Sequence, residues 1–187
     1  NKKIHRHCSG RHKEHLFKSV DPKNSLSTTF HKTNTLKKKV TKVAEVSLKY
    51  KTRIKPSERI QIKSSADAYN IFIQGWNEDT LEHVEEFKIL LLNRANKALG
   101  TAQISLGGTA GTVTDVKLIF QYALKTNAQG LIICHNHPSG NNQPSDADKK
   151  ITLKIKEAAE LLDMHLMDHI IITPHDGYYS FADDGLL

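Results

Sequence analysis

Three side chains within a short stretch of this chain have the types and spacing of a metal site. His135 and His137 lie two residues apart, directly after the apolar run LIIC, and Asp148 follows eleven residues later. Side chains two apart in a strand point to the same face, so the two imidazoles should converge. A loop containing Pro and Gly could fold the Asp148 carboxylate back toward them. Three such ligands leave the fourth position of a tetrahedral Zn²⁺ free for water, as in catalytic zinc sites.

The same stretch has an interpretation that needs no metal. Ser145-x-x-Asp148 is the pattern of a capping box at the start of a helix, which accounts for both residues structurally. A His-x-His pair also occurs by chance. The zinc site and the helix cap therefore both stand as interpretations of these residues.

Two further interpretations conflict with elementary geometry. Cys134 precedes His135, but adjacent strand residues point to opposite faces, so the two cannot pair as nucleophile and base without distortion. The string His-Asn-His at 135–137 shares its letters with the HNH nuclease motif. That motif spreads its residues over a ββα unit rather than three consecutive positions, so the match is misleading.

The elements that must position these residues alternate between strands and helices. The segment VEEFKILLLN at 84–93 has a continuous apolar centre, which predicts a central strand buried on both faces. It should form an antiparallel hairpin with the next strand, while crossover helices favour parallel neighbours, so we expect an α/β domain with a mixed sheet. We expect strands at 46–50, 84–93, 98–106, 131–134, 166–173 and 178–181. We expect helices at 65–76, capped by Ser65, at 115–127, capped by Thr114 or Asp115, and at 145–162, with a loop at 75–80.

Charge divides the chain into two regions. Residues 1–42 contain 12 Lys and Arg against two acidic residues, a net charge of +10. This leaves 15 of the 27 basic and 18 of the 20 acidic residues for 43–187, so the overall +7 arises from the N-terminal segment. We therefore expect a basic, flexible tail at 1–42 and one catalytic-sized domain at 43–187. The tail could bind nucleic acid or an acidic partner by charge neutralisation, or simply be a solvated extension.

The remaining composition narrows the class of protein. Cys8 and Cys134 are the two cysteines, so no disulfide framework is indicated and a reducing cytoplasm fits. No apolar run reaches the roughly 20 residues that span a bilayer, and no signal-peptide hydrophobic region opens the chain. We therefore expect a soluble, cytoplasmic protein without a membrane partner.

The motif resembles that of a known family. His135-x-His137, seven residues, Ser145, two residues and Asp148 match the metal motif of the JAB/MPN domains, the JAMM hydrolases. The surrounding HNHPSG, the MDHIII at 167–172 and the terminal SF and DGLL are similar to the RadC-like branch. The resemblance covers roughly residues 45–187 and leaves the tail unexplained.

The resemblance implies a fold, a metal and a reaction. The fold would be the three-layer, cytidine-deaminase-like JAB/MPN domain, a mixed sheet flanked by helices. The family uses a strand glutamate as general base; the position two before an aromatic selects Glu85, ahead of Phe87, with Glu86 as the alternative. Zn²⁺ would lower the pKa of a bound water toward about 7, and Glu85 would take its proton during attack on an amide carbonyl. Ser145 would then stabilise the oxyanion, in addition to beginning the helix.

Three other residues have roles that the resemblance suggests. Asp168 and His169 could orient a ligand imidazole, because zinc-bound histidines usually donate their other N–H to a neighbouring group. The alternative is an Asp that starts a strand and a buried structural His. Lys117 stands where RadC-like chains usually have Arg, which preserves the charge but weakens a two-pronged contact.

Three functions remain open from the sequence. The first is a zinc hydrolase acting on a peptide or isopeptide amide of a protein substrate. The second is a nucleic-acid-associated protein, suggested by the DNA-repair label of the RadC-like branch and by the basic tail, with a phosphodiester as substrate. The third is a metal-binding scaffold without catalysis, against which Glu85 argues. Substrate specificity would arise from the loops around 107–115 and 138–144, and the sequence does not set the oligomeric state.

Overall fold

The computed structural model describes residues 49–107 and 113–187. The basic segment 1–42 lies outside the described residues, as does most of the strand expected at 46–50. Residues 49–55 are described and form no strand.

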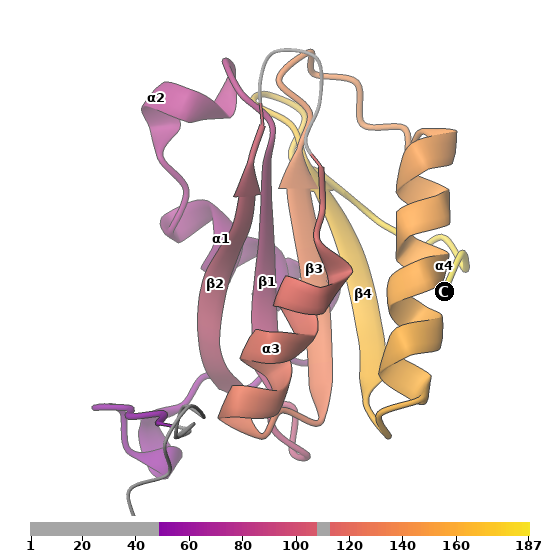
Figure 1. Ribbon diagram of the computed structural model, residues 1–187. Helices are drawn as coiled ribbons and strands as arrows, with labels where there is room; N and C mark the ends of the chain where they lie inside the picture. Colours follow the sequence, from indigo (N-terminus) through magenta and orange to yellow (C-terminus); the bar gives the residue numbers. More distant parts are fainter. Residues whose placement is uncertain (1–48, 108–112) are drawn as a thin grey trace, which may run out of the picture. The chain divides into compact units, whose positions relative to one another are not determined.

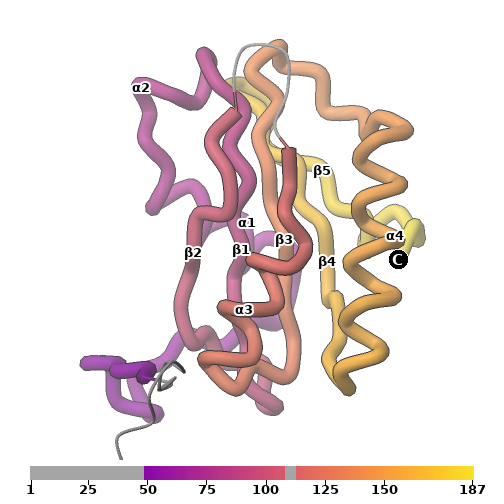
Figure 2. The backbone as a smooth tube through the Cα atoms, viewed as in Figure 1, coloured from indigo at the N-terminus to yellow at the C-terminus, as the bar shows by residue number. Residues whose placement is uncertain are grey.

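A five-stranded mixed sheet forms the middle of the domain (Figure 1). Its strands are β1 (Glu86–Leu92), β2 (Ala98–Leu106), β3 (Gly130–Asn136), β4 (His165–Ile172) and β5 (Tyr178–Ser180). They lie in the order β2-β1-β3-β4-β5; β3 and β4 are parallel, and the other neighbours are antiparallel. The short β5 lies beside β4 (Figure 2). The predicted hairpin, the interior position of the ILLL strand and the mixed sheet are all confirmed.

Helices cover both faces of this sheet, so the domain has three layers. The helical segments are the 3₁₀ turn Pro56–Glu58, α1 (Ser65–Gln74), α2 (Glu78–Leu81), α3 (Val116–Thr126) and α4 (Asp146–Glu160). Helices α3 and α4 pack on one face and α1 packs on the other (Figure 1). This agrees with the three-layer α/β fold expected from the sequence. No helix in the described part of the chain is long and apolar enough to cross a membrane.

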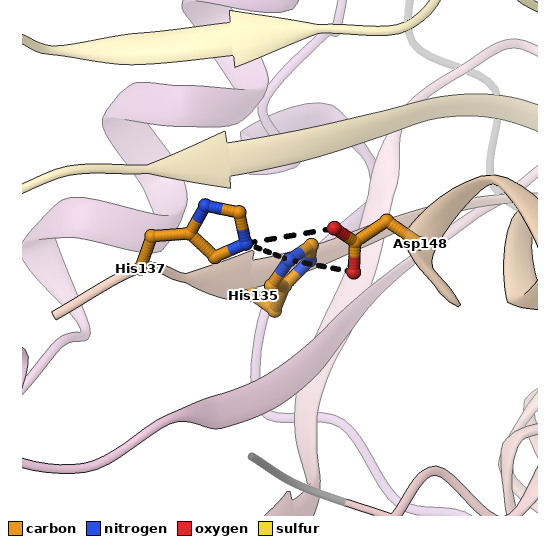
Figure 3. A group of neighbouring side chains, drawn as sticks. All are labelled: His135, His137 and Asp148. Atoms are coloured by element: carbon orange, nitrogen blue, oxygen red, sulfur yellow. Dashed lines mark hydrogen bonds and ion pairs between the residues drawn. The ribbon is translucent and has the colours of Figure 1, made fainter. Parts of the chain in front are cut away.

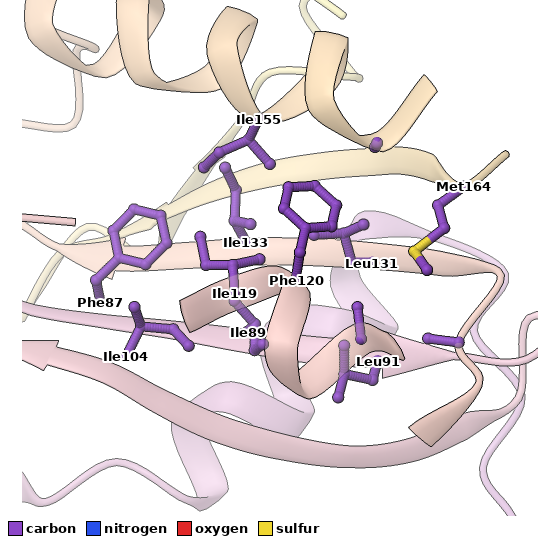
Figure 4. Packing of buried hydrophobic residues seen from close by; sticks show 13 residues of the cluster. Phe87, Ile89, Leu91, Ile104, Ile119, Phe120, Leu131, Ile133, Ile155 and Met164 are labelled. Atoms are coloured by element: carbon purple, nitrogen blue, oxygen red, sulfur yellow. The ribbon is translucent and has the colours of Figure 1, made fainter. Parts of the chain in front are cut away.

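The alternation of side chains along β1 feeds two separate hydrophobic cores. Phe87, Ile89 and Leu91 point into the core beneath α3 and α4 (Figure 4), whereas Leu90 and Leu92 point into the core beneath α1. Both faces of the strand are therefore covered, which explains why the sequence reads as an unbroken apolar run. Strand β3 alternates in the same way.

Two local expectations need correction. Helix α1 is capped by Ser64 rather than Ser65, because the Ser64 hydroxyl accepts from the backbone N–H of Asp67 and the Asp67 carboxylate accepts from that of Ser64. The capping box needs a three-residue spacing, which Ser64 has and Ser65 lacks. Within the loop expected at 75–80, the short helix α2 begins, with the Asn77 side chain accepting from the N–H of Asp79.

A buried ion pair lies on the α1 side of β1. The Lys88 ammonium is 3.1 Å from the Glu86 carboxylate and 3.8 Å from the ring centre of Trp76. The Thr80 hydroxyl donates to the other carboxylate oxygen of Glu86 at 2.5 Å. Both charges are largely removed from water, with 11% and 4% of the Lys88 and Glu86 side chains exposed. Each therefore depends on the other for compensation.

We expect Lys88→Met to destabilise the domain by about 3–5 kcal/mol, because it leaves the Glu86 carboxylate buried without a cation. The double variant Glu86→Gln/Lys88→Met should recover most of this loss. Urea unfolding measures both. Lys55→Met is the matched control, since Lys55 pairs with Glu58 at the surface and its loss should cost under about 1 kcal/mol. Equal effects of the two lysine substitutions would contradict the assignment.

Candidate metal centre

The two histidines and the aspartate meet at the carboxyl end of β3. His135 lies in β3, His137 follows just beyond its end, and Asp148 lies in the first turn of α4. The Nε2 atoms of the imidazoles are 2.9 Å apart. The Asp148 carboxylate is 3.2 Å from His135 Nε2 and 3.6 Å from His137 Nε2 (Figure 3). Ligand atoms of all three residues lie within 4.8 Å of one another, so the group could hold a metal ion.

The start of α4 places the aspartate. Ser145 is the N-cap, and its hydroxyl accepts from the Asp148 N–H at 3.2 Å. In return, Asp148 Oδ2 accepts from the Ser145 N–H at 2.7 Å, while Oδ1 faces His135. The capping box and the metal interpretation are thus compatible, because Oδ1 faces His135 while Oδ2 serves the cap and also lies near His137.

A backbone carbonyl fixes the proton of His137. Its Nδ1 lies 2.6 Å from the carbonyl oxygen of Asn141. A carbonyl only accepts, so Nδ1 carries the hydrogen, and Nε2 of the neutral ring presents a lone pair to the centre.

A longer chain of hydrogen bonds fixes the proton of His135. The Thr152 hydroxyl lies 2.5 Å from the carbonyl oxygen of Asp148, to which it must donate. It therefore accepts from Nδ1 of His169, 2.6 Å away. Burial and the neighbouring His135 lower the pKa of His169 well below its usual value, so this ring is neutral and its Nε2 is an acceptor. His135 Nδ1, 2.8 Å from that Nε2, consequently carries the hydrogen, which leaves His135 Nε2 as a lone-pair donor.

The three candidate ligands have the chemistry of a cation site. Two imidazole lone pairs and a carboxylate oxygen point at one small volume, an arrangement that is repulsive unless positive charge lies among them. The donor set of imidazole nitrogens and a carboxylate oxygen suits zinc and related transition ions. The partners behind both rings are those that metal-bound histidines ordinarily have. The residues therefore fit a bound cation.

Electrostatics at the centre point the same way. Burial lowers the pKa of His137, but the neighbouring Asp148 carboxylate and the Asn141 carbonyl outweigh it, and the pKa is raised overall. The charges of Asp148 and Glu85 add to this rise. Burial alone would raise the pKa of Asp148, yet the two neighbouring imidazoles hold it well below its usual range. The centre thus favours positive charge among its ligands.

A cleft of about 640 Å³ opens over the candidate metal centre and is lined by Glu85 and Ser145 together with His135, His137 and Asp148. Its other lining residues are Phe87, Val113, Thr114, Ala147 and Ile151. Glu86 lies on the opposite face of the sheet, in the ion pair with Lys88. Of the two glutamates considered from the sequence, Glu85 is therefore the one placed at the centre.

The Ser145 hydroxyl is engaged in this structure. It lies 2.6 Å from Asp148 Oδ2, to which it donates. The predicted cap is present, whereas a role for this hydroxyl toward substrate requires it to turn from Asp148 into the cleft that it lines.

The residues expected behind the ligands divide into two kinds. His169 contacts His135 as expected, but the expectation for Asp168 is wrong. Its carboxylate accepts from the Ser180 hydroxyl and from the backbone N–H groups of Ala182 and His169, on the α1 side of the sheet. Adjacent residues of β4 point to opposite faces, so the two could not both reach the metal ligands. Lys117 is exposed on the first turn of α3.

Cys134 has the inert environment that strand alternation predicts. Its side chain lies in the core beneath α1, fully buried, on the opposite face from His135. Burial raises the pKa of its thiol well above the usual value. A thiolate nucleophile is therefore disfavoured at this position.

Two residues whose side chains support the candidate site were not identified from the sequence. Thr152 lies one helical turn after Asp148, a spacing that places both on one face and could have drawn attention to it. Asn136 is a fully buried amide within an otherwise apolar strand face. A polar residue at such a position needs hydrogen-bond partners, but the sequence does not say where they lie.

Comparison with known proteins gives one consistent result. Residues 62–186 match the family model described as the RadC-like JAB domain. A UPF0758 protein of Flavobacterium johnsoniae is 52% identical over 126 residues, which are 67% of this chain and 53% of that protein. UPF0758 proteins of Porphyromonas gingivalis and Clostridium kluyveri are 44% and 34% identical, over 55% and 80% of this chain and 45% and 63% of their own lengths. The chain thus spans about half the length of the curated relatives it matches.

We expect Thr152→Val to weaken zinc binding about 10- to 100-fold, because it removes the acceptor that holds the His169 ring and, through it, the His135 tautomer. Competition with a chromogenic chelator measures the affinity. Thr126→Val is the matched control, since the Thr126 hydroxyl also bonds to a carbonyl of its own helix, at 2.9 Å from Tyr122 O. Unchanged affinity in the Thr152 variant would refute the chain of hydrogen bonds.

Cys134 should resist alkylation in the folded protein. In a Cys8→Ser variant, which leaves Cys134 as the single thiol, iodoacetamide at pH 8 should label the chain only after urea unfolding. Mass spectrometry detects the adduct. Rapid labelling of the native protein would show that the thiol is accessible and ionised, contrary to its burial.

Proposed function

The chain belongs to the RadC-like JAB domain family, and from this premise we propose that it is a zinc-dependent hydrolase of peptide or isopeptide amides. The match to the family model confirms the resemblance to the RadC-like branch that the metal motif predicted. The observation that carries the proposal is the shared cleft, in which a carboxylate, Glu85, stands beside the three candidate metal ligands. A scaffold that only binds metal has no need of such a group.

His135, His137 and Asp148 would hold the zinc ion. When bound, zinc supplies a Lewis acid that polarises a carbonyl and acidifies water at neutral pH. The chain itself supplies the orientation of the ligands, through Asn141 O behind His137 and through His169 behind His135.

Glu85 is proposed as the general base. It is half-buried and lines the cleft together with His137, and its negative charge contributes to the raised pKa of His137. A carboxylate in this position can accept a proton from the attacking water and return it to the leaving amine. Glu86 cannot share this work, because Lys88 and Thr80 hold its carboxylate on the other face of the sheet.

Ser145 is proposed to stabilise negative charge on the carbonyl oxygen of the substrate. Its hydroxyl is a donor at the wall of the cleft, and hydrogen bonds of this kind contribute several kcal/mol to hydrolysis. Its backbone N–H remains bonded to Asp148 throughout, so the helix cap need not break when the hydroxyl turns.

The test uses the zinc-loaded chain with a pool of peptides, an isopeptide-linked branched peptide and a DNA oligonucleotide as substrates. We expect amide cleavage, and a loss of about 10²- to 10⁴-fold in kcat for Glu85→Gln with zinc content retained. Mass spectrometry detects the new amines. Glu82→Gln is the matched control, since Glu82 is an exposed carboxylate near His175 and should keep full activity.

Three outcomes would overturn the proposal. Equal kcat values for Glu85→Gln and the wild type would show that Glu85 is not the general base. Cleavage of the oligonucleotide instead of the amides would make the chain a nuclease, in line with the nucleic-acid alternative. Absence of cleavage of all substrates, with zinc bound stoichiometrically, would favour the scaffold.

A further inference from the structure

The residue between the two candidate ligands has a side chain that reaches the opposite face of the sheet. Asn136 ends β3 and is fully buried. His135 and His137 point to the metal centre, so strand alternation directs the Asn136 amide toward α2 and the start of β1. No role assigned so far uses this group.

All three polar arms of that amide bind one short backbone segment. Asn136 Nδ2 donates to the carbonyl oxygen of Leu81 at 2.7 Å and to that of Val84 at 3.0 Å. Its Oδ1 accepts from the backbone N–H of Glu86 at 2.7 Å. Both donor hydrogens and the oxygen of the amide therefore form hydrogen bonds with the connection from α2 to β1.

The segment held in this way contains Glu85. Its two chain neighbours, Val84 and Glu86, are both bonded to Asn136, one through a carbonyl and the other through an N–H. The Glu85 carbonyl itself accepts from the Gly107 N–H at 2.8 Å, on the β2 side. The regular pairing of β1 with β3 begins only at Phe87 and His135, so near Glu85 the side chain of Asn136 supplies what the ladder would supply elsewhere.

We infer that Asn136 is a positioning residue, which fixes the backbone of Glu85 relative to the metal ligands on either side of itself. This inference rests on the proposed function for the part that concerns catalysis. Its physical basis is that Asn136 lies between His135 and His137 in the chain, so the amide and these two candidate ligands share one stretch of backbone. Any displacement of Glu85 from the ligands must therefore stretch or break these three bonds.

The chemistry of the site explains why an amide is needed. Aspartate has no hydrogens to donate, so it would set its oxygens against the carbonyls of Leu81 and Val84 and bury a charge. Alanine removes this partner from one buried N–H and from two partly buried carbonyls, each at a cost in free energy.

The experiment compares Asn136→Ala and Asn136→Asp with a matched control, Asn93→Ala. The Asn93 side chain also binds the backbone, accepting from Ala95 and Lys97 at 2.9 Å each, but at the far end of β1. We expect zinc affinity within about threefold of wild type in every variant, because the ligands are retained. In the Asn136 variants kcat should fall about 10- to 100-fold with KM nearly constant, as for a reacting group displaced by about 1 Å.

Hydrogen exchange provides a readout that does not depend on activity. In Asn136→Ala, the amide of Glu86 should exchange faster while peptides from 88–92 keep their protection. In Asn93→Ala the pattern should be reversed, with changes confined to 93–97. Uniformly faster exchange along β1 would indicate a merely structural role and would overturn the inference.

The outcomes separate this inference from the proposed function. If Glu85→Gln abolishes amide cleavage but the Asn136 variants keep wild-type kcat, the inference fails and the function stands. A fall in zinc affinity of more than tenfold with normal kcat at saturating zinc would also overturn it, because Asn136 would then hold the ligands. If wild type cleaves no amide, the proposed function fails, and hydrogen exchange at Glu86 alone tests the inference. Faster exchange of this amide in Asn136→Ala supports the positioning role, and unchanged protection refutes it.

Discussion

The strict alternation of side chains along the paired strands β1 and β3 is the constraint on which the rest of this structure depends. Phe87 pairs with His135, and the antiparallel direction brings Glu85 toward His137. Because both strands are buried on both faces, each successive residue must belong to one of two different environments. One face collects the groups suited to chemistry. The other collects Glu86, which pairs with Lys88 and bonds to Thr80 of α2, together with Asn136, which bonds to Leu81 of α2, and Cys134, which packs in the core beneath α1. A shift of one residue in either strand would exchange the two sets.

Backbone carbonyls determine which nitrogen of each imidazole at the candidate metal centre carries the hydrogen. The carbonyls of Asn141 and Asp148 can only accept hydrogen bonds, and each lies at the end of a chain that leads to an imidazole. The protons are therefore driven to the far side of both rings, and the Nε2 lone pairs are left facing Asp148. Thr152 on α4 and His169 on β4 relay the hydrogen bond from the Asp148 carbonyl to His135, and neither is itself a candidate ligand. The tautomers are a property of the folded backbone rather than of the histidines alone.

One carboxylate joins the fold to the centre. Asp148 caps α4 through Oδ2 and faces His135 through Oδ1, so the position of a candidate ligand is tied to the first turn of a 15-residue helix. The helix in turn packs Ile155 and Ala159 into the core beneath it. The helix cap and the metal interpretation are therefore compatible, since the spacing Ser-x-x-Asp serves both. Rigid elements holding reacting groups in this way reduce the reorganisation that catalysis would otherwise require.

The choice of Glu85 came from the resemblance to the RadC-like branch. The amino-acid sequence by itself determined the five strands of the sheet, their mixed pairing and the three candidate ligands. These rest on short-range periodicity and spacing, which the chain carries locally. Its errors were also local: Ser64 and Ser65 are adjacent and chemically alike, and only the partner at Asp67 separates them. Only the tertiary structure decided that Glu86 belongs to Lys88, that Asp168 faces away from the metal centre while His169 faces it, and that Asn136 binds residues some 50 positions earlier. Such partners are set by which strands become neighbours, and hydrogen bonds between distant segments leave no periodic trace in the sequence.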